Sequence, residues 1–428
     1  MIKVSDQRAA GPSKKRRTRI GRPPRKIDAE KTIAKLSRLK PPYLNLKLLI
    51  PVICIALFGL AMVYSASWYN SSIYHGTKYY FFTNQAIGFL MGGILLTMCY
   101  LIDYRTYKRF YIAIYAIGAI LLLAVFIPGL GITRLGSSRW IGIGGFTMQP
   151  SEVAKFAFII FAAAIATGVS SGRSKINSKT LQTGKPQALE ISTGKHDILS
   201  FKKSLLILGA GLAYCGLILL EPNLSITLVL GMTTFVVLFL CGAKIKHLAC
   251  MAAPALVALP VMLIAEPYRV RRLLAFIDPW ARPKDEGFQL IQSLFGLGNG
   301  GFFGVGYGNS TQKHMFLPFS ESDFIFSIIG EEFGFLGCMI FIAVLAYIIL
   351  QIFKTGMRCN DYFGKYVCYG IGTVIFIQSV VNLAVVTGTI PPTGVPLPFI
   401  SFGGTSLAVC MAAIGIVLNV EKNNRKNN

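Results

Sequence analysis

Residues 296–337 read GLGNGGFFGVGYGNSTQKHMFLPFSESDFIFSIIGEEFGFLG, and this stretch decides the class of fold that the chain can adopt. A glycine-rich polar segment leads directly into a long apolar run that carries two adjacent acids, Glu331 and Glu332. Glycine allows close backbone approach, and an acid within an apolar span is costly unless it has a partner. The stretch therefore predicts a chemical or transport site at the surface of a membrane.

The composition of the whole chain also favours a membrane protein. Of its 428 residues, 53% are hydrophobic and 14% are charged, whereas soluble domains usually carry about 25% charged residues. Several apolar runs reach the ~20 residues that a helix needs to cross a bilayer. A β-barrel would instead show short segments of alternating hydrophobicity. We therefore expect an all-α, polytopic membrane protein.

Ten apolar runs are interpreted as membrane spans. They are 48–66, 81–102, a third that ends at Ile127, 152–169, 203–220, 225–242, 248–266, 323–352, 366–386 and 402–420. The chain then divides into three parts. Residues 1–47 are expected to form a basic, disordered tail, and residues 48–420 a ten-span membrane domain with one large external loop at 267–322. Residues 421–428 are expected to form a short C-terminal tail.

Basic residues set the expected orientation of these spans. The tail at 1–47 holds 15 Lys or Arg and three acids, and further basic residues lie at 103–109 and near the C-terminus. Because Lys and Arg concentrate in cytoplasmic loops, both chain termini are expected in the cytoplasm. The tail is expected to contact anionic lipid or a partner protein. Its Gly21-Arg22-Pro23 sequence is only half of a DNA-binding hook, so no nucleic acid partner is expected.

Four segments that carry unusual polar or irregular sequence fall on the opposite, outer side, where they could meet at one surface. They are 134–155, 277–289, the glycine-rich stretch and 387–406. In the first, Ser151 is a candidate N-cap and Glu152 lies in the first helical turn, where Lys155 can pair with it. In the last, four prolines and four glycines exclude a regular helix, so the backbone is expected to line a cavity or to be covered by protein.

Pro391 to Ser406 reads PPTGVPLPFISFGGTS, which closely resembles the signature of the SEDS family (shape, elongation, division and sporulation). The segment 300–337 and the motifs Arg139-Trp140-Ile141 and Gln149-Pro150-Ser151-Glu152 are similar to further blocks of that family. Within 309–326 the chain looks most like the FtsW and SpoVE branch rather than RodA. The resemblance covers roughly residues 48–420.

SEDS proteins are ten-span peptidoglycan glycosyltransferases that polymerise lipid II, so the resemblance implies the same activity here. The reaction would proceed with inversion and release undecaprenyl pyrophosphate, during division, at the septum of a bacterial inner membrane. The implied partners are lipid II, a class B penicillin-binding protein, other division proteins and membrane lipid. No tightly bound cofactor and no protein-held metal are expected, although a divalent cation (Mg or Mn) is a candidate companion of the pyrophosphate.

The chain departs from the family pattern at the expected catalytic acid. Many members read DPxxDPxGxGYQ, whereas residues 278–289 read DPWARPKDEGFQ, so Arg282 stands at the acidic position. We predict that Asp285 is the general base that accepts the attacking hydroxyl proton, with Glu286 as the alternative. Basic groups would stabilise the leaving pyrophosphate. The predicted substrate-binding residues are Arg139, Trp140, Glu152, Lys155, Arg282, Lys284, Gln289, Lys313, Asp323 and Ser401.

Two other functions fit parts of the sequence. A lipid II flippase would suit the acids Glu331 and Glu332 and the irregular backbone at 387–401, but the chain has no internal repeat. A non-catalytic division scaffold would suit the displaced acid and the basic tail. We interpret Glu331 and Glu332 as structural acids that hold their span to its neighbours.

Overall fold

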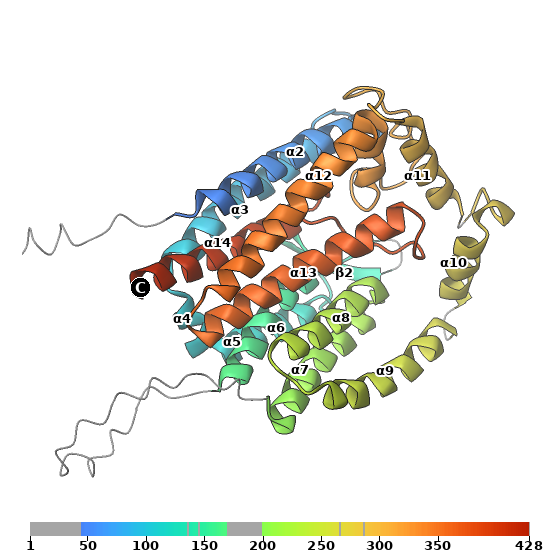
Figure 1. Ribbon diagram of the computed structural model, residues 1–428. Helices are drawn as coiled ribbons and strands as arrows, with labels where there is room; N and C mark the ends of the chain where they lie inside the picture. Colours follow the sequence, from blue (N-terminus) through green and yellow to red (C-terminus); the bar gives the residue numbers. More distant parts are fainter. Residues whose placement is uncertain are drawn as a thin grey trace, which may run out of the picture. The chain divides into compact units, whose positions relative to one another are not determined.

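Each apolar run that is expected to cross the membrane forms a helix in the computed structural model, which describes residues 44–134, 137–143, 146–168, 199–264, 267–285 and 287–427 (Figure 1). Most of the basic tail, Glu286 and most of the polar loop after the fourth span lie outside the described residues. The helices are α2 (Leu46–His75), α3 (Tyr80–Leu101), α4 (Tyr104–Arg109), α5 (Tyr111–Ala124), α6 (Pro150–Thr167), α7 (Phe201–Leu220), α8 (Leu224–Leu240), α9 (Ile245–Ile264), α10 (Pro267–Ile277), α11 (Phe288–Asn299), α12 (Ile325–Met357), α13 (Tyr362–Val386) and α14 (Gly404–Asn427).

The expected all-α, polytopic fold is confirmed. Among the described residues, seven helices are long and apolar enough to cross a bilayer by length and composition: α2, α3, α6, α7, α12, α13 and α14. Helices α5 and α8 are apolar but shorter. Helix α9 has 20 residues and contains Pro254 and Pro260, and it packs on α8 and α10.

Several helix limits differ from the expected spans. Helix α2 continues to His75, well beyond the expected end of the first span, and ends at Gly76, whose positive φ of 66° closes the helix. The basic loop at 103–109 is largely helical, because Asp103 caps α4 by accepting a hydrogen bond from the Arg105 N–H at 2.9 Å. Helix α14 continues through the segment expected to be a C-terminal tail.

A small antiparallel sheet lies between α5 and α6, where the sequence predicts no strands. Its order is β1 (Gly131–Arg134), β2 (Ser137–Ile143) and β3 (Phe146–Met148). The register pairs Ile132 with Trp140 and Ile141 with Met148. The sheet fixes the backbone that carries Arg139 and Trp140.

The large loop between α9 and α12 contains the amphipathic helix α10, the short 3-10 helix η2 (Pro279–Ala281) and the helix α11. Helix η2 packs against α10 and α11, and α11 packs against α12 and α13. Residues 300–324 follow without helix or strand. The loop is therefore built largely from short ordered elements that rest on the membrane helices.

Helix α12 is broken at Gly334, whose φ of 66° and ψ of −168° are not helical. The glycine-rich segment lies against this break. The Val305 N–H donates to the Glu331 carbonyl at 2.9 Å, and the Phe335 N–H donates to the Gly301 carbonyl at 2.9 Å. A Cβ on Gly304 would clash with the Glu332 carbonyl. The close approach that these glycines allow is thus to α12 itself.

Helices α3 and α14 pack closely through small residues. A Cβ on Gly88 would lie 2.8 Å from the Gly404 carbonyl oxygen, and a Cβ on Gly92 would lie 2.6 Å from the Met411 sulfur. Without water to drive apolar faces together in a bilayer, close approach of backbones supplies the contact. This contact brings the signature segment before α14 next to the first helices of the chain.

The outer segments meet at one end of the bundle, which we call the sheet end because it includes β1–β3. Thr405 donates to the Thr147 carbonyl at 2.9 Å, joining the signature segment to the sheet. The Phe402 N–H donates to the Glu321 carbonyl at 2.9 Å, joining it to residues 300–324. The expectation that these segments share a surface is confirmed for these three.

The short basic segments meet at the other end, which we call the α4 end. The Tyr104 N–H donates to Asn419 Oδ1 at 2.8 Å, so α4 contacts the end of α14. Asn424 Nδ2 donates to the Arg358 carbonyl at 2.6 Å, so α14 also contacts the end of α12. The basic residues at this end predict that it faces the cytoplasm.

Candidate functional site

Asp323 lies at the sheet end, two residues before α12 begins, and is partly buried. Burial, and then repulsion from Glu321, raise the pKa of Asp323 to about 6, while the charges of Arg272 and Arg139 oppose this rise. A Cβ on Gly394 would lie 3.2 Å from Asp323 Oδ2, so the signature segment also borders the carboxylate. A carboxyl group that titrates near pH 6 can exchange protons or bind cations close to neutral pH.

The two arginines near Asp323 come from separate elements. Arg139 on β2 donates from Nε to the Glu221 carbonyl at 3.2 Å and from Nη2 to the Pro222 carbonyl at 2.5 Å. Arg272 on α10 donates to the Pro392 carbonyl at 3.5 Å. We call Arg139, Arg272 and Asp323 the outer cluster. Its two guanidinium groups could bind a phosphate or a pyrophosphate.

Glu221 lies at the turn between α7 and α8, where its carbonyl accepts from Arg139. Its side chain is fully buried, and neither carboxylate oxygen accepts a hydrogen bond from the described residues. Burial raises the pKa of Glu221 to about 8, against the opposing charge of Arg139. The group is therefore mostly protonated at neutral pH.

Glu152 and Lys155 form a buried ion pair in the first turns of α6. Lys155 Nζ lies 2.8 Å from Glu152 Oε1, and both side chains are fully buried. Ser406 Oγ on α14 donates to Glu152 Oε2 at 2.9 Å. The expected Glu–Lys pair is confirmed. The expected N-cap is wrong, because α6 begins at Pro150 with Gln149 before it, and the Ser151 hydroxyl is buried within the helix.

Lys313 is fully buried beside the break in α12. Its Nζ lies 3.2 Å from Glu332 Oε1, contacts Ser65 Oγ at 3.4 Å, and donates to the Gly308 carbonyl. Ser65 on α2 also donates to Glu332 Oε1 at 2.5 Å. The lysine therefore links residues 300–324 to α2 and α12.

Glu331 holds the neighbouring loop by three hydrogen bonds. Its carboxylate accepts from the Ser310 hydroxyl, from the Thr311 N–H at 3.1 Å and from the Gln312 N–H at 3.2 Å. These contacts use both carboxylate oxygens. The interpretation of Glu331 and Glu332 as acids that join α12 to its neighbours agrees with these bonds.

Ser401 joins the signature segment to Ser322, the residue before Asp323. Its hydroxyl donates to the Ser322 carbonyl at 2.7 Å and accepts from the Leu397 N–H at 2.8 Å. Gln85 on α3 reaches the same segment, donating to the Ser401 carbonyl at 3.2 Å and accepting from the Gly403 N–H at 2.9 Å. Ser401 thus orders the backbone next to Asp323.

Asp285 lies in an exposed turn between η2 and α11, together with the exposed Arg282 and Lys284. The Asp285 N–H donates to the Arg282 carbonyl at 3.3 Å, and the Asp285 carbonyl accepts from the Phe288 N–H at 3.1 Å. The backbone of this turn is therefore held while the side chains face outward. Gln289 is half-buried at the start of α11, and Glu286 lies outside the described residues.

The predicted site residues fall into four places rather than one. Arg139 and Asp323 share the outer cluster, Glu152 pairs with Lys155, Lys313 pairs with Glu332, and Asp285 shares its turn with Arg282 and Lys284. Within the described residues, no group of three or more His, Cys, Asp or Glu side chains could hold a metal ion.

Sequence reasoning did not select Arg272 or Glu221 as site residues. Arg272 belongs to a run of basic residues in the loop 267–322, and such a run is typical of a site for an anionic ligand. Glu221 precedes Pro222 in the short turn between the spans 203–220 and 225–242, and the local sequence of this turn indicates a tight connection between two helices rather than a site. The contact of Glu221 with Arg139 and the proximity of Arg272 to Asp323 depend on the packing of segments far apart in the chain.

Comparison with known proteins identifies the family. Residues 46–426 match the FtsW/RodA/SpoVE model, described as a cell cycle protein. A probable peptidoglycan glycosyltransferase FtsW of Geobacter sp. (strain M18) is 34% identical over 372 residues, which cover 87% of this chain and 95% of the relative. Stage V sporulation protein E of Bacillus subtilis (strain 168) is 34% identical over 382 residues, which cover 89% and 98%.

A solved structure shares the fold. One chain of "Structural coordination of polymerization and crosslinking by a peptidoglycan synthase complex" matches with a TM-score of 0.68 and 24% identity, and the match covers 89% of this chain and 98% of that one. With the family match and the two relatives, this protein belongs to the FtsW/RodA/SpoVE family of cell cycle proteins, the SEDS family that its motifs resemble.

Proposed function

We propose that this protein is a peptidoglycan glycosyltransferase that polymerises lipid II into glycan strands during cell division. The observation that carries the proposal is that family motifs from distant parts of the chain meet at the sheet end, around Arg139 and Asp323. Relatives named as peptidoglycan glycosyltransferases match nearly the whole membrane domain. The substrate is lipid II, a disaccharide-pentapeptide on undecaprenyl pyrophosphate.

The proposed reaction needs one base and one stabilised leaving group. A sugar hydroxyl of one molecule attacks the anomeric carbon of another and loses its proton to Asp285, or to Glu286 in the alternative assignment. The bond from the anomeric carbon to the pyrophosphate oxygen breaks, and undecaprenyl pyrophosphate leaves with the electron pair. The exposure of Asp285 supports this role, because the carboxylate can reach a sugar.

Positive charge near the leaving pyrophosphate has two proposed sources. Arg282 and Lys284 lie on the same turn as the proposed base, and Arg139 and Arg272 converge at the outer cluster. Such groups stabilise the charge that develops as the bond breaks. A divalent cation such as Mg²⁺ or Mn²⁺ would be bound to the pyrophosphate of the substrate rather than held by the protein. If the substrate carries such a cation, a chelator is expected to slow polymerisation.

The two buried lysines can bind lipid II only by exchanging partners. Lys155 would have to leave Glu152, and Lys313 would have to leave Glu332. Removing one member of a buried pair costs roughly 3–5 kcal/mol, because the other charge is left without a partner. We propose that these residues contact lipid II only when its pyrophosphate replaces the carboxylate.

The protein is a multi-pass membrane protein, and we propose that it lies in the bacterial inner membrane at the division septum, with both termini in the cytoplasm. A class B penicillin-binding protein is the proposed partner. Its support is the likeness to a chain of a peptidoglycan synthase complex that couples polymerisation to crosslinking. Other division proteins and anionic membrane lipid are the proposed partners of the basic tail.

A flippase is the second candidate, and the break in α12 favours it, because transporters often place discontinuous helices at their substrate sites. The hydrogen bonds of Glu331 argue against it, because they occupy that acid with protein donors. The full-length protein in proteoliposomes with lipid II, with and without a class B partner, separates the two. We expect glycan strands to form. Movement of lipid II between leaflets without strands would establish a flippase. If neither strands nor movement were seen, the non-catalytic scaffold would be the remaining candidate.

A further inference from the structure

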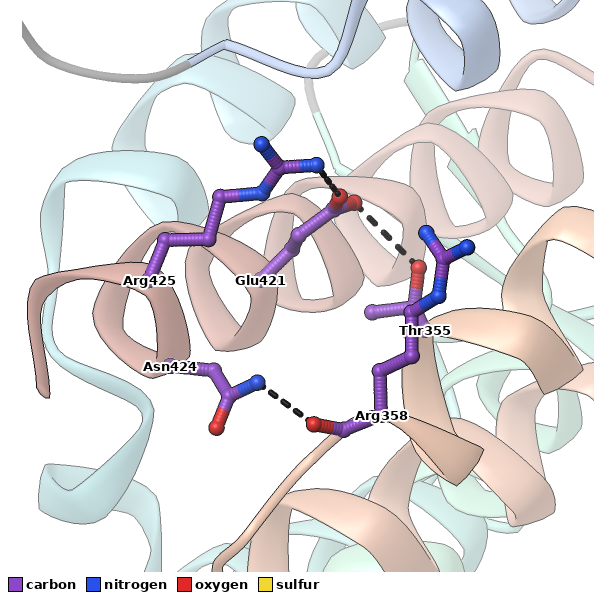
Figure 2. Close-up of a pocket in the computed structure, with 5 residues that line it drawn as sticks. All are labelled: Thr355, Arg358, Glu421, Asn424 and Arg425. Carbon is purple, nitrogen blue, oxygen red and sulfur yellow. Dashed lines mark hydrogen bonds and ion pairs between the residues drawn. The ribbon is translucent and has the colours of Figure 1, made fainter. Parts of the chain in front are cut away.

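A polar pocket lies at the α4 end of the bundle, away from the outer cluster. It has a volume of about 390 Å³ and is lined by residues at the ends of α12 and α14: Thr355, Arg358, Glu421, Asn424 and Arg425. Figure 2 shows Arg358 on one side of the pocket and Arg425 on the other, with Glu421 between them. Nothing in the proposed reaction uses this pocket.

The acid in the pocket already has partners within the protein. Glu421 is buried, and its Oε2 accepts from Asn45 Nδ2 at 2.5 Å and from Thr355 Oγ1 at 3.3 Å. Its Oε1 lies 3.4 Å from Arg425 Nη2. Three donors from three parts of the chain therefore bind the Glu421 carboxylate. The negative charge of Glu421 does not need a cationic ligand.

Arg358 supplies positive charge that the acid does not neutralise. Its side chain is exposed, and among the described residues no carboxylate lies within ion-pair distance of its guanidinium group. Its carbonyl accepts from Asn424 Nδ2 at 2.6 Å, so the end of α12 is fixed against α14 (Figure 2). Arg358 therefore adds a positive charge to a pocket whose walls are held in place.

The last turns of α12 also expose large hydrophobic side chains. Leu350 and Met357 are 65% and 63% exposed, although both are large hydrophobic side chains. In a membrane-spanning helix such side chains contact acyl chains. The pocket thus lies where an apolar helix surface ends and charged residues begin, as expected at the level of lipid headgroups.

We propose that this pocket binds the phosphate ester of an anionic lipid headgroup at the cytoplasmic surface of the membrane. A guanidinium group binds phosphate oxygens through two parallel hydrogen bonds. Basic pockets between membrane helices on the cytoplasmic side are a known setting for anionic headgroups. A phosphate held between Arg358 and Arg425 would tie the ends of α12 and α14 to the lipid surface.

The test is native mass spectrometry of the purified full-length protein titrated with phosphatidylglycerol. We expect Arg358→Ala to weaken binding of this lipid by roughly ten-fold, because the variant loses the charge-assisted hydrogen bonds from the guanidinium group to the phosphate. The matched control is Lys354→Ala, which removes an equal charge one turn earlier on α12, outside the pocket. If the pocket is a specific site rather than a region of diffuse charge, Lys354→Ala should retain at least about half of the affinity for phosphatidylglycerol.

Further arms separate the sources of the phosphate. Glycerol phosphate, which has no acyl chains, should bind only weakly. If it binds tightly and Arg358→Ala abolishes that binding, the pocket is a phosphate site whose ligand is a soluble molecule rather than a lipid. Phosphatidylcholine with the same acyl chains should bind more weakly than phosphatidylglycerol. Equal losses in Arg358→Ala and Lys354→Ala, or no loss in either, would overturn the proposal. Polymerisation is not measured, so this result is independent of the proposed function.

Discussion

Asp323 and Glu221 are two acids of the sheet end whose surroundings set their protonation. Burial disfavours the carboxylate form of both, and Arg139 opposes that effect for both. The pKa of Asp323 reaches about 6, whereas that of Glu221 reaches about 8. At pH 7, therefore, Asp323 is mostly ionised and Glu221 is mostly neutral. Two acids linked to the same arginine thus have different charges.

Asp323 gives a prediction for the pH dependence of activity. If its carboxylate positions the arginines on lipid II, polymerisation should increase as pH rises through about 6, because the ionised form gains population there. Asp323→Asn should remove this step and lower the rate. The measurement is the initial rate of glycan formation across pH, with Asp103→Asn at the α4 end as the control. If the rate of Asp323→Asn still rises near pH 6, the titrating group is a residue other than Asp323.

Glu221 gives a prediction for stability. Because its pKa in the folded protein is raised above that of the unfolded chain, the stabilising preference for the protonated form is complete at low pH and is lost as pH rises through about 8. Glu221→Gln removes this titration while keeping the shape. We expect equal thermal stability at pH 4 and a variant more stable by several kcal/mol at pH 9, because each unit by which the pKa is raised corresponds to about 1.4 kcal/mol. Equal melting curves at pH 9 would contradict the burial of an unpaired carboxylate.

At the scale of elements, the break in α12 determines how the glycine-rich segment packs. Residues 301–306 bond to the backbone on both sides of Gly334. These bonds satisfy groups that a broken helix would leave unpaired within the membrane region. The nearby Glu331 and Lys313 add side-chain bonds to the same loop. The loop and the helix therefore form one structural unit.

The break predicts a strong effect of a single methyl group. Gly334→Ala requires a positive φ that alanine rarely adopts, and its Cβ would lie 2.7 Å from the Phe302 carbonyl oxygen. We expect a loss of roughly 1–3 kcal/mol in stability and a lower yield of folded protein. Gly298→Ala is the control, because a Cβ there meets no atom within 4 Å. Equal stabilities of the two variants would show that the break is not fixed as described.

The sequence predicts the elements well, because apolar runs of sufficient length have few alternatives to a membrane helix. It does not predict the strands β1–β3, since these short segments carry no clear alternation and depend on neighbouring loops. It also does not predict the break, since Gly334 lies inside the expected span 323–352 and no local signal separates it from the other glycines there. The grouping of Arg272 with Arg139 and Asp323 arises from tertiary contacts that no local pattern records.

At the scale of the whole molecule, the two ends of the bundle differ in charge and in content. The α4 end gathers short basic segments, and the sheet end gathers the family motifs. Positive residues on short loops favour the cytoplasm. The basic residues therefore predict that the two ends lie on opposite sides of the membrane, with the α4 end in the cytoplasm.

This orientation predicts which positions an impermeant reagent reaches. Asp285→Cys should react with a membrane-impermeant maleimide in intact spheroplasts, above the background of the unaltered chain. Asp103→Cys should react only after the membrane is permeabilised, because it lies at the α4 end. Both positions are exposed, so burial does not explain a difference. Labelling of Asp103→Cys in intact spheroplasts would reverse the orientation.

The most direct test of the central claim is the glycan product formed from purified lipid II by the full-length protein with its class B partner. We predict that the unaltered chain forms strands, and that Asp285→Asn loses about 10²–10⁴-fold in rate while still binding lipid II, as expected for loss of a general base. If Glu286→Gln shows that loss instead, the base is the neighbouring acid. Strands formed at the normal rate by both variants, or no strands from the unaltered chain, would contradict the account.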